Sequence, residues 1–221
     1  MKQENNIWVS SDFHLSHKNI TGPKLSNWKS GYRNFDSIEQ MNDTIINGIN
    51  NSVQQDDQLL YLGDFYFGDR DRMQEMRDRI VCKNIIYILG NHDKHGSGNK
   101  VIDGKLEFRD NTREIKKVFG IQNVFTTLEF DMNGILFFLS HYAHRVWDKS
   151  HRNAIHLYGH SHDGLDKYDE EWGKSMDCSI ESAFRIFKEW RPMNLVKEIV
   201  PIMNKRTVKI VDHHGDGSEV K

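Results

Sequence analysis

Short apolar runs that end directly in polar residues are the feature of this sequence that most constrains its fold. Three such runs in the first half of the chain are Ile7–Ser11, Leu59–Gly63 and Asn84–Gly90. They are too short for helices, and the third is rich in β-branched residues, so we expect three β-strands. Helical patterns lie between them. The order strand, helix, strand, helix, strand predicts parallel strands with helical crossovers.

Both crossovers carry helix signals. Ser37 is a candidate N-cap with Gln40 three residues further on, and apolar residues then recur at helical spacing to about residue 53. Methionine and isoleucine side chains share one helical face in the segment 69–80. We therefore expect one helix from 37 to 53 and a second from 69 to 80.

The second half of the chain has a different pattern. The apolar runs Val124–Met132 and Ile135–Ser140 flank an Asn-Gly dipeptide, which predicts a two-residue hairpin turn because both positions tolerate positive φ. Ile155–Tyr158 predicts another strand, whereas Leu195–Met203 fits either a helix or a strand. We expect antiparallel pairing in this half. The predicted fold is an α/β, four-layer αββα sandwich of two mixed β-sheets flanked by helices.

Composition limits the class of protein. The length of 221 residues fits one domain, expected over residues 1–204, with 205–221 as a C-terminal strand or polar tail, partly disordered. A formal net charge of −2 argues against the global basic field of a dedicated nucleic-acid binder. No apolar run approaches the roughly 20 residues of a membrane span. The N-terminus lacks the pattern of a signal peptide.

Cysteine usage indicates a reducing compartment. Cys82 and Cys178 lie in no metal-ligand spacing, so we expect both to be small, partly buried hydrophobic residues. These features predict a cytoplasmic protein without membrane contact, and the sequence gives no indication of its oligomeric state.

Five polar motifs each follow a predicted strand. They are Asp12-Phe13-His14, Gly63-Asp64, Gly90-Asn91-His92-Asp93, Ser140-His141 and Gly159-His160-Ser161-His162. Ligands gather beyond the carboxyl ends of strands in parallel sheets, so these motifs are expected at one edge. The chain also has 12 histidines, and eight fall in two zones, 92–95 and 141–162.

This set of residue types suits metal chemistry. Two divalent metals about 3.5–4 Å apart can clamp the attacking and leaving oxygens of a phosphoryl group, and imidazole and carboxylate groups are appropriate ligands. Residues i and i+2 of a strand share one face. Asp12 with His14, and His160 with His162, should therefore each present two ligands on one side if the local backbone is extended.

Taken together and in order, the motifs resemble those of the calcineurin-like metallophosphoesterase family. The stretch from His151 to His162 is similar to a short bacterial and phage-type branch of that family. The resemblance implies one metal held by Asp12, His14 and His162. It implies a second metal held by Asn91, His141 and His160, with Asp64 bridging the two.

The resemblance also implies catalytic roles. His92 would not bind metal but would act as a general acid or stabilise the transition state electrostatically, and Asp93 would orient it. His17, Asn19, Arg145 and Arg152 are candidate substrate contacts, with a solvated surface as the alternative. The stretch 175–181 departs from the valine- and glycine-rich strand of the short branch. An extra segment, Ala183 to Trp190, is expected as a helix beside the cleft.

The implied function is that of an enzyme, a dinuclear-metal-dependent phosphoesterase. It would hydrolyse a phosphomonoester or small phosphodiester, including nucleotides, with metal-activated water. Manganese is the first choice of metal, with iron, zinc or nickel as alternatives. The runner-up is a metal-dependent nuclease, which would need a groove of Lys and Arg that the near-neutral charge disfavours. A non-catalytic metal-binding scaffold is disfavoured because His92 and every ligand motif are present.

Overall fold

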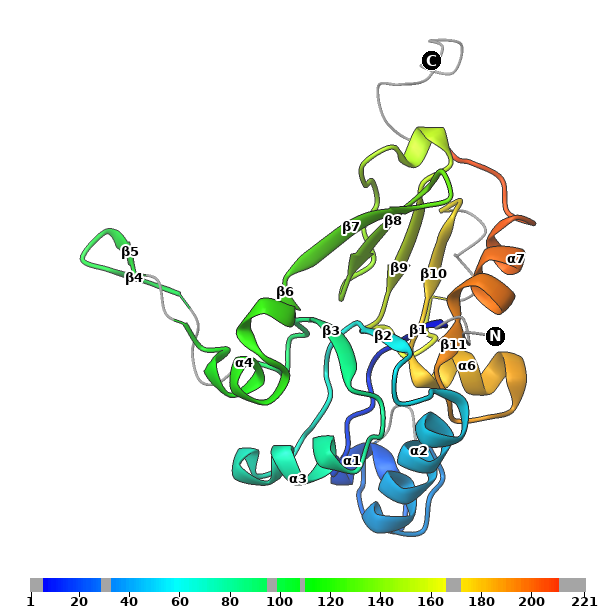
Figure 1. The fold of residues 1–221 in the computed structure, drawn as a ribbon. Coiled ribbons are helices and arrows are strands. Elements are labelled where there is room, and N and C mark those ends of the chain that lie inside the picture. The colour runs from blue at the N-terminus through cyan, green and yellow to red at the C-terminus, as the bar shows by residue number, and fades with distance from the viewer. Residues whose placement is uncertain (1–5, 29–32, 95–98, 108–109, 166–171, 211–221) are drawn as a thin grey trace.

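Two β-sheets packed face to face form the body of the protein (Figure 1). The computed structural model describes residues 6–28, 33–94, 99–107, 110–165 and 172–210. Helices flank the sheets, so the expected α/β class with two mixed sheets is confirmed.

The first sheet has the strand order β11-β1-β2-β3-β6. Its members are β1 (Ile7–Ser10), β2 (Gln58–Tyr61), β3 (Asn84–Ile88), β6 (Val124–Phe125) and β11 (Met193–Asn194). The strands β1, β2, β3 and β6 are parallel, as predicted, and β11 runs antiparallel to β1. The carboxyl ends of β1, β2 and β3 therefore meet at one edge.

The second sheet has the order β10-β9-β8-β7. Its members are β7 (Thr127–Met132), β8 (Ile135–Ser140), β9 (Ile155–Tyr158) and β10 (Ser175–Asp177). Only β7 and β8 are antiparallel, joined by the predicted turn with Asn133 at φ 55° and Gly134 at φ 80°. The prediction of an antiparallel second half is otherwise wrong. The chain returns from β8 to a parallel β9 through an irregular segment that has no helical periodicity.

One apolar run connects the two sheets. The sequence suggested a single strand over Val124–Met132, but the run divides at Thr126. Its first part, β6, pairs with β3 in the first sheet, and its second part, β7, pairs with β8 in the second sheet.

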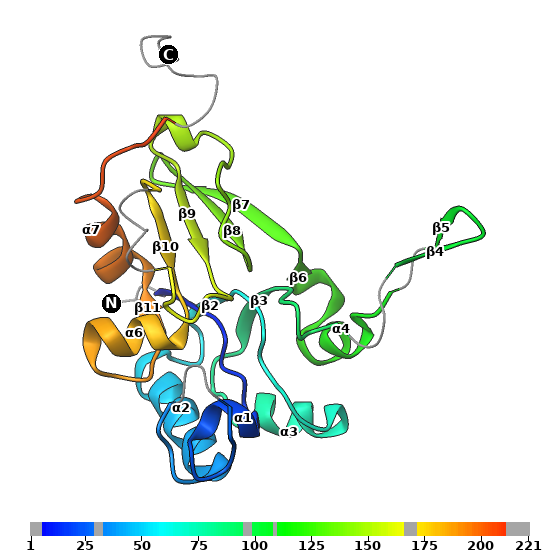
Figure 2. The same ribbon diagram turned by 180° about the vertical axis from the view of Figure 1, so that it is seen from behind.

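Helices cover the outer face of the first sheet (Figure 2). They are α1 (Lys18–Thr21), α2 (Ile38–Ser52), the 3-10 turn η1 (Arg70–Arg72), α3 (Met73–Asp78), α4 (Arg113–Phe119) and the 3-10 turn η2 (Ile121–Asn123). Both predicted crossover helices are confirmed, the second split between η1 and α3. The Ser37 side chain caps α2 by accepting from the Gln40 backbone N–H at 3.0 Å.

Apolar side chains alternate between two cores. Leu59 and Tyr61 of the β2 region pack against the helices, whereas Leu60 and Leu62 pack between the sheets. This period-2 alternation buries both faces of the first sheet. The apolar interface fixes how the sheets face each other and so positions the loops that follow their strands.

The outer face of the second sheet is covered by the segment 141–154. This segment contains one 3-10 turn, η3 (Ser150–Arg152). Trp147 and Ala154 form a small apolar cluster with Phe138 there, and the His156 ring lies 5.2 Å from the Trp147 ring. An irregular segment thus takes the place of a helix on this face.

Helices lie on both sides of β11 in the C-terminal part of the described chain. α6 (Ile180–Phe187) precedes β11. The π-helical turn η4 (Leu195–Ile199) and α7 (Val200–Met203) follow it, so Leu195–Met203 is helical. Residues 205–210 form neither strand nor helix, and 211–221 lie outside the described residues. Within the described ranges, no helix is long and apolar enough to cross a membrane.

A hairpin of β4 (Lys100–Ile102) and β5 (Lys105–Glu107), which the sequence did not suggest, projects from the body on the side of α4 (Figures 1 and 2). Cys82 and Cys178 are both fully buried, whereas the sequence suggested partial burial.

Candidate metal centre

Loops from both sheets converge on one cluster of polar side chains. The loops after β1, β2 and β3 bring Asp12, His14, Asp64 and Asn91, and the loops after β8 and β9 bring His141, His160 and His162. The structure therefore brings together all seven residues that the sequence proposed as ligands.

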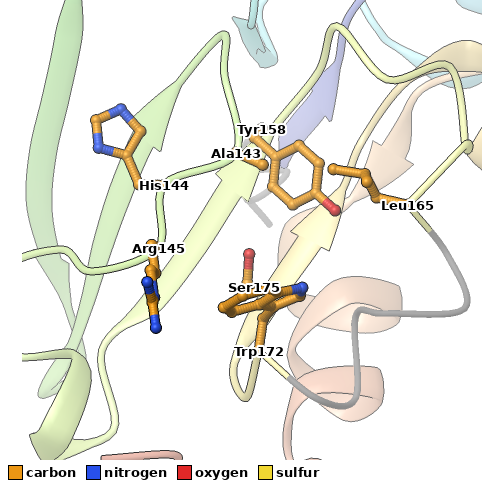
Figure 3. Close-up of a pocket in the computed structure, with 7 residues that line it drawn as sticks. All are labelled: Ala143, His144, Arg145, Tyr158, Leu165, Trp172 and Ser175. Atoms are coloured by element: carbon orange, nitrogen blue, oxygen red, sulfur yellow. The ribbon is translucent and has the colours of Figure 1, made fainter. Parts of the chain in front are cut away.

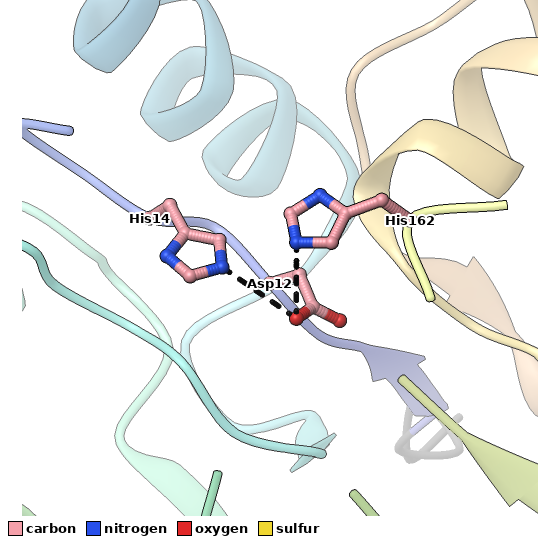
Figure 4. A group of neighbouring side chains, drawn as sticks. All are labelled: Asp12, His14 and His162. Carbon is pink, nitrogen blue, oxygen red and sulfur yellow. Dashed lines mark ion pairs between the residues drawn. The ribbon is translucent and has the colours of Figure 1, made fainter. Parts of the chain in front are cut away.

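The first ligand group consists of Asp12, His14 and His162 (Figure 4). The Asp12 Oδ1 atom lies 3.7 Å from His14 Nε2 and 3.6 Å from His162 Nε2. Ligand atoms bound at about 2.0–2.2 Å to one ion lie roughly 3–4 Å from each other, so this spacing fits an ion. Asp12 Oδ1 is buried and has no hydrogen-bond partner in the described part of the chain. Such an orphaned carboxylate oxygen fits a cation-binding role.

The second ligand group contains Asp64, Asn91, His141 and His160. Asp64 Oδ2 lies 3.4 Å from His141 Nε2, and it also lies 3.6 Å from His14 Nε2 of the first group. Asn91 Oδ1 lies 2.9 Å from His141 Nε2 and 2.8 Å from His160 Nδ1. Asp64 thus stands between the two groups, where a bridging carboxylate could contact an ion on either side.

The backbone at these positions is not extended. Five candidate ligands have positive φ, namely Asp12 (57°), His14 (45°), Asp64 (61°), His160 (67°) and His162 (47°). The assumption that alternate residues point the same way along an extended strand is therefore wrong. Left-handed turns, held by bonds such as Asp12 N–H to the Gly63 carbonyl at 2.9 Å, direct these side chains instead.

The motif glycines leave room for the carboxylates. A Cβ on Gly90 would lie 2.0 Å from Asp64 Oδ1, and a Cβ on Gly159 would lie 2.5 Å from Asp12 Oδ2. These contacts are far closer than any side chain could tolerate. Glycine is required at both positions because of this close approach.

The two buried carboxylates of the cluster, Asp12 and Asp64, carry negative charge that favours the binding of cations. Burial raises the pKa of Asp64, but the hydrogen bond and charge of His141 bring it below its ordinary value. Burial likewise raises the pKa of Asp12, but the nearby rings of His14, His162 and His141 more than offset this effect and hold the pKa below its ordinary value. Both buried carboxylates are therefore ionised at neutral pH. Against burial, the hydrogen bond to Asp64 raises the pKa of His141 to about 9.

His92 lies at a cavity of about 460 Å³ beside the first group. His14, His17, Trp28, Ser161 and His162 also line this cavity. The His92 side chain is exposed, and its ring lies 5.4 Å from the ring of His14. Its backbone N–H donates to Asp64 Oδ1 at 2.8 Å. The His92 ring therefore borders this cavity and belongs to neither ligand group.

Asp93 connects two of the ligand-bearing loops. Its carboxylate accepts from the Asp64 backbone N–H at 3.0 Å, the Gly90 backbone N–H at 2.7 Å and the Tyr87 hydroxyl at 2.7 Å. Burial and the nearby charge of Asp64 raise the pKa of Asp93 to about 6. These bonds fix the loops after β2 and β3 relative to each other. An effect of Asp93 on the orientation of His92 stays a prediction.

The four candidate substrate contacts occupy different places. His17 lines the metal-site cavity and stacks on Phe67, with ring centroids 3.8 Å apart. Arg145 lines a separate cavity of about 180 Å³ (Figure 3), where Tyr158, Leu165, Trp172 and Ser175 gather. Asn19 and Arg152 line neither of these two cavities.

Sequence reasoning missed three charged residues behind the ligands. Glu181 accepts from His162 Nδ1 at 2.8 Å and pairs with Arg33, whose guanidinium also donates to the backbone of the first motif. Asp177 accepts from the Ser161 hydroxyl and from the Asp163 backbone N–H. Burial raises the pKa of Asp177 to about 7. The only local signal was an acidic residue in the first turn of a helix, which is common without any site.

Comparisons with known proteins agree with this geometry. A model of the calcineurin-like phosphoesterase family matches residues 6–218. An uncharacterized protein of Methanocaldococcus jannaschii is 35% identical over 99 residues, which is 44% of this chain and 52% of that relative, so the match spans about half of the relative's length.

Two solved structures are also similar. A protein of unknown function from Aquifex aeolicus has 16% identity and a TM-score of 0.56, with 87% of this chain and 96% of that chain covered, so it shares the fold. An archaeal phosphodiesterase has 16% identity and a TM-score of 0.39, covering 70% of this chain and 72% of its own, which is too distant a likeness to carry an argument.

Proposed function

Because this chain belongs to the calcineurin-like phosphoesterase family, whose members are metal-dependent, we propose that it hydrolyses a phosphomonoester or a small phosphodiester with two divalent metal ions. The observation that carries the proposal is the position of Asp64. Its Oδ2 atom lies within 3.6 Å of a ligand nitrogen in each of the two groups. A pair of adjacent ions sharing one carboxylate accounts for this arrangement.

The ligand assignment follows the two groups. Asp12, His14 and His162 would hold one ion, and Asn91, His141 and His160 would hold the other, with Asp64 shared. When bound, such ions activate water and neutralise charge on the phosphoryl oxygens. Nitrogen and oxygen donors of this kind suit manganese first, and also iron, zinc or nickel.

The protein's own contribution to the chemistry is assigned to His92. Its exposed ring faces the cavity in which the phosphate would lie. From there Nδ1 or Nε2 can donate a proton to the leaving-group oxygen as the ester bond breaks, an effect worth about 10²–10⁴-fold in rate. His17 is proposed to line the substrate's path because it borders the same cavity.

A small substrate is favoured over a nucleic acid. No Lys or Arg is among the described residues that line the 460 Å³ cavity. Polynucleotide binding draws most of its affinity from such cations along the phosphate backbone. The volume falls within the roughly 300–1,000 Å³ range of small-molecule sites. A mononucleotide is therefore a suitable candidate, and a nuclease remains the second choice.

The test combines metal content with hydrolysis. Metal-free protein titrated with Mn²⁺ should bind two equivalents and then hydrolyse bis-p-nitrophenyl phosphate, p-nitrophenyl phosphate or mononucleotides faster than single-stranded DNA. Asp64→Asn should weaken the binding of both ions and remove most turnover, because the shared carboxylate loses its charge. Absence of metal binding at saturating Mn²⁺ would contradict the proposal. Two bound ions without hydrolysis of any of these esters would favour the scaffold.

A further inference from the structure

Glu181 and Arg33 form a buried ion pair directly behind the first ligand group. The Arg33 side chain is 1% exposed and that of Glu181 is 19% exposed. Arg33 donates to Glu181 Oε1 through Nε at 2.8 Å and through Nη2 at 2.7 Å. Removing both charges from water is costly, and loss of either partner would leave the other charge buried and unpaired.

The Glu181 carboxylate determines how His162 presents its ring. Glu181 Oε1 lies 2.8 Å from His162 Nδ1, and an ionised carboxylate can only accept, so Nδ1 carries the proton. In the neutral ring, which is the form that can bind a metal, the lone pair is then on Nε2. That is the nitrogen which lies 3.6 Å from Asp12 Oδ1, on the side of the first ligand group. A carboxylate behind a histidine fixes both the tautomer and the ring orientation of a metal ligand.

The Arg33 guanidinium fixes the backbone of the neighbouring ligand loop. Nη2 donates to the Asp12 carbonyl and Nη1 donates to the Phe13 carbonyl, both at 2.6 Å. The left-handed conformation of Asp12 takes this stretch out of regular strand geometry, with φ at 57°. A planar fork can serve two carbonyls and a carboxylate at once, which a lysine ammonium cannot do with the same geometry.

We infer that Arg33 and Glu181 are positioning residues that set the affinity of the ion held by Asp12, His14 and His162. The inference rests on the two-metal function proposed above. Neither residue is among the ligands. Within the described residues, the hydrogen bonds and ion pairs of both side chains reach the first group through His162 and through the backbone of Asp12 and Phe13, and none reaches Asn91, His141 or His160. Their loss should therefore affect one ion and spare the other.

The experiment is a calorimetric Mn²⁺ titration of metal-free protein. Glu181→Gln should weaken one of the two binding events by roughly 10–100-fold and leave the other at its wild-type affinity. Arg33→Lys, which keeps the charge but loses the fork, should weaken the same event. The matched control is Glu198→Gln. Glu198 is 20% exposed and pairs with Arg191 at 2.8 Å, away from the ligands, so both ions should bind as in the wild type.

A second readout needs no metal. Burial lowers the pKa of His162, but the charge and hydrogen bond of Glu181 outweigh it and raise the pKa to about 9. In ¹⁵N–¹H spectra of the metal-free protein recorded above that pH, the neutral His162 ring should be a single Nδ1–H tautomer in the wild type and in Glu198→Gln. It should become a tautomer mixture in Glu181→Gln, because an amide can present either its oxygen or its NH₂ group to the ring.

The outcomes separate the two proposals. A wild-type chain that binds no Mn²⁺ would remove the two-metal function itself. The positioning role alone would be overturned if the wild type binds two ions and Glu181→Gln changes neither the Mn²⁺ affinities nor the His162 tautomer. An equal loss of affinity for both ions in Glu181→Gln would also overturn the positioning role. If Glu181→Gln does not fold, the affinities of Arg33→Lys decide.

Discussion

At the scale of single residues, the candidate ligands combine a donor atom with a backbone that most residues avoid. Asp12, His14, Asp64, His160 and His162 all have φ between 45° and 67°. Asp, Asn and His are several-fold enriched in this left-handed region compared with other non-glycine residues. The Asp and His residues of the motifs therefore supply the ligand atoms and also tolerate the left-handed turns in which these atoms are presented. Replacing such a residue by Ala should remove a donor and also strain the loop that carries it.

His92 offers the sharpest test at this scale. His92→Ala should keep the full metal content, because the ring lies at the cavity and outside both ligand groups. Turnover of an alkyl phosphate should fall by about 10²-fold or more, since an alkoxide leaves poorly without a proton. The loss on a p-nitrophenyl ester should be distinctly smaller. Steady-state kinetics with metal analysis on the same samples measure this. Equal losses on both esters would instead point to electrostatic stabilisation.

Gly90 tests the close approach around Asp64. Gly90→Ala would place a Cβ 2.0 Å from Asp64 Oδ1, so the carboxylate must move from its place between the ligand groups. We expect the variant to fold but to lose tightly held metal, measured as metal content after gel filtration. Gly134→Ala is the control. Its Cβ would meet nothing within 4 Å, and its φ of 80° should cost only about 1–2 kcal/mol of stability. Two retained equivalents in Gly90→Ala would contradict the steric argument.

At the scale of elements, the irregular cover of the second sheet depends on one buried histidine. His156 is 0% exposed on β9. Its Nε2 accepts from the His144 backbone N–H at 3.0 Å, and its Nδ1 donates to the Phe138 carbonyl at 3.1 Å. A neutral imidazole supplies one donor and one acceptor, and both are used. The ring thus ties the segment after β8 to the sheet beneath it.

This histidine predicts a pH dependence of folding stability. Burial lowers the pKa of His156 from 6.5 to about 3. The unfolded chain therefore binds more protons than the folded chain between these values. Stability should fall as the pH drops through that window, by up to about 1.4 kcal/mol per pH unit from this group. His156→Gln can replace both hydrogen bonds and does not titrate. Urea unfolding of metal-free protein at several pH values should give it a flatter profile, and parallel profiles would exclude His156 as the cause.

At the scale of the whole molecule, the parts that could be predicted from sequence were those with local signals. The five strand-end motifs and the order of the first three strands were enough to place seven side chains at one edge. The path after β8 was predicted wrongly because a parallel return through an irregular segment leaves no periodic pattern. Arg33 and Glu181 were missed because their pairing joins residues that are 148 positions apart. No local pattern can show such a contact.

The ligand cluster draws on both sheets, and this has a consequence for the chain as a polymer. An ion shared by Asp12 and His162 would join the ends of a long loop that contains β2, β3 and β6 of the first sheet and β7, β8 and β9 of the second. Closing a loop costs entropy that rises only with the logarithm of its length. In this fold, apolar contacts between the two sheets, among them Leu60 and Leu157, already hold the loop ends together and offset the entropy of loop closure. A binding ion would therefore find the two ends of this loop already close together. Removing the ions with a chelator should empty the site and leave the fold around it intact.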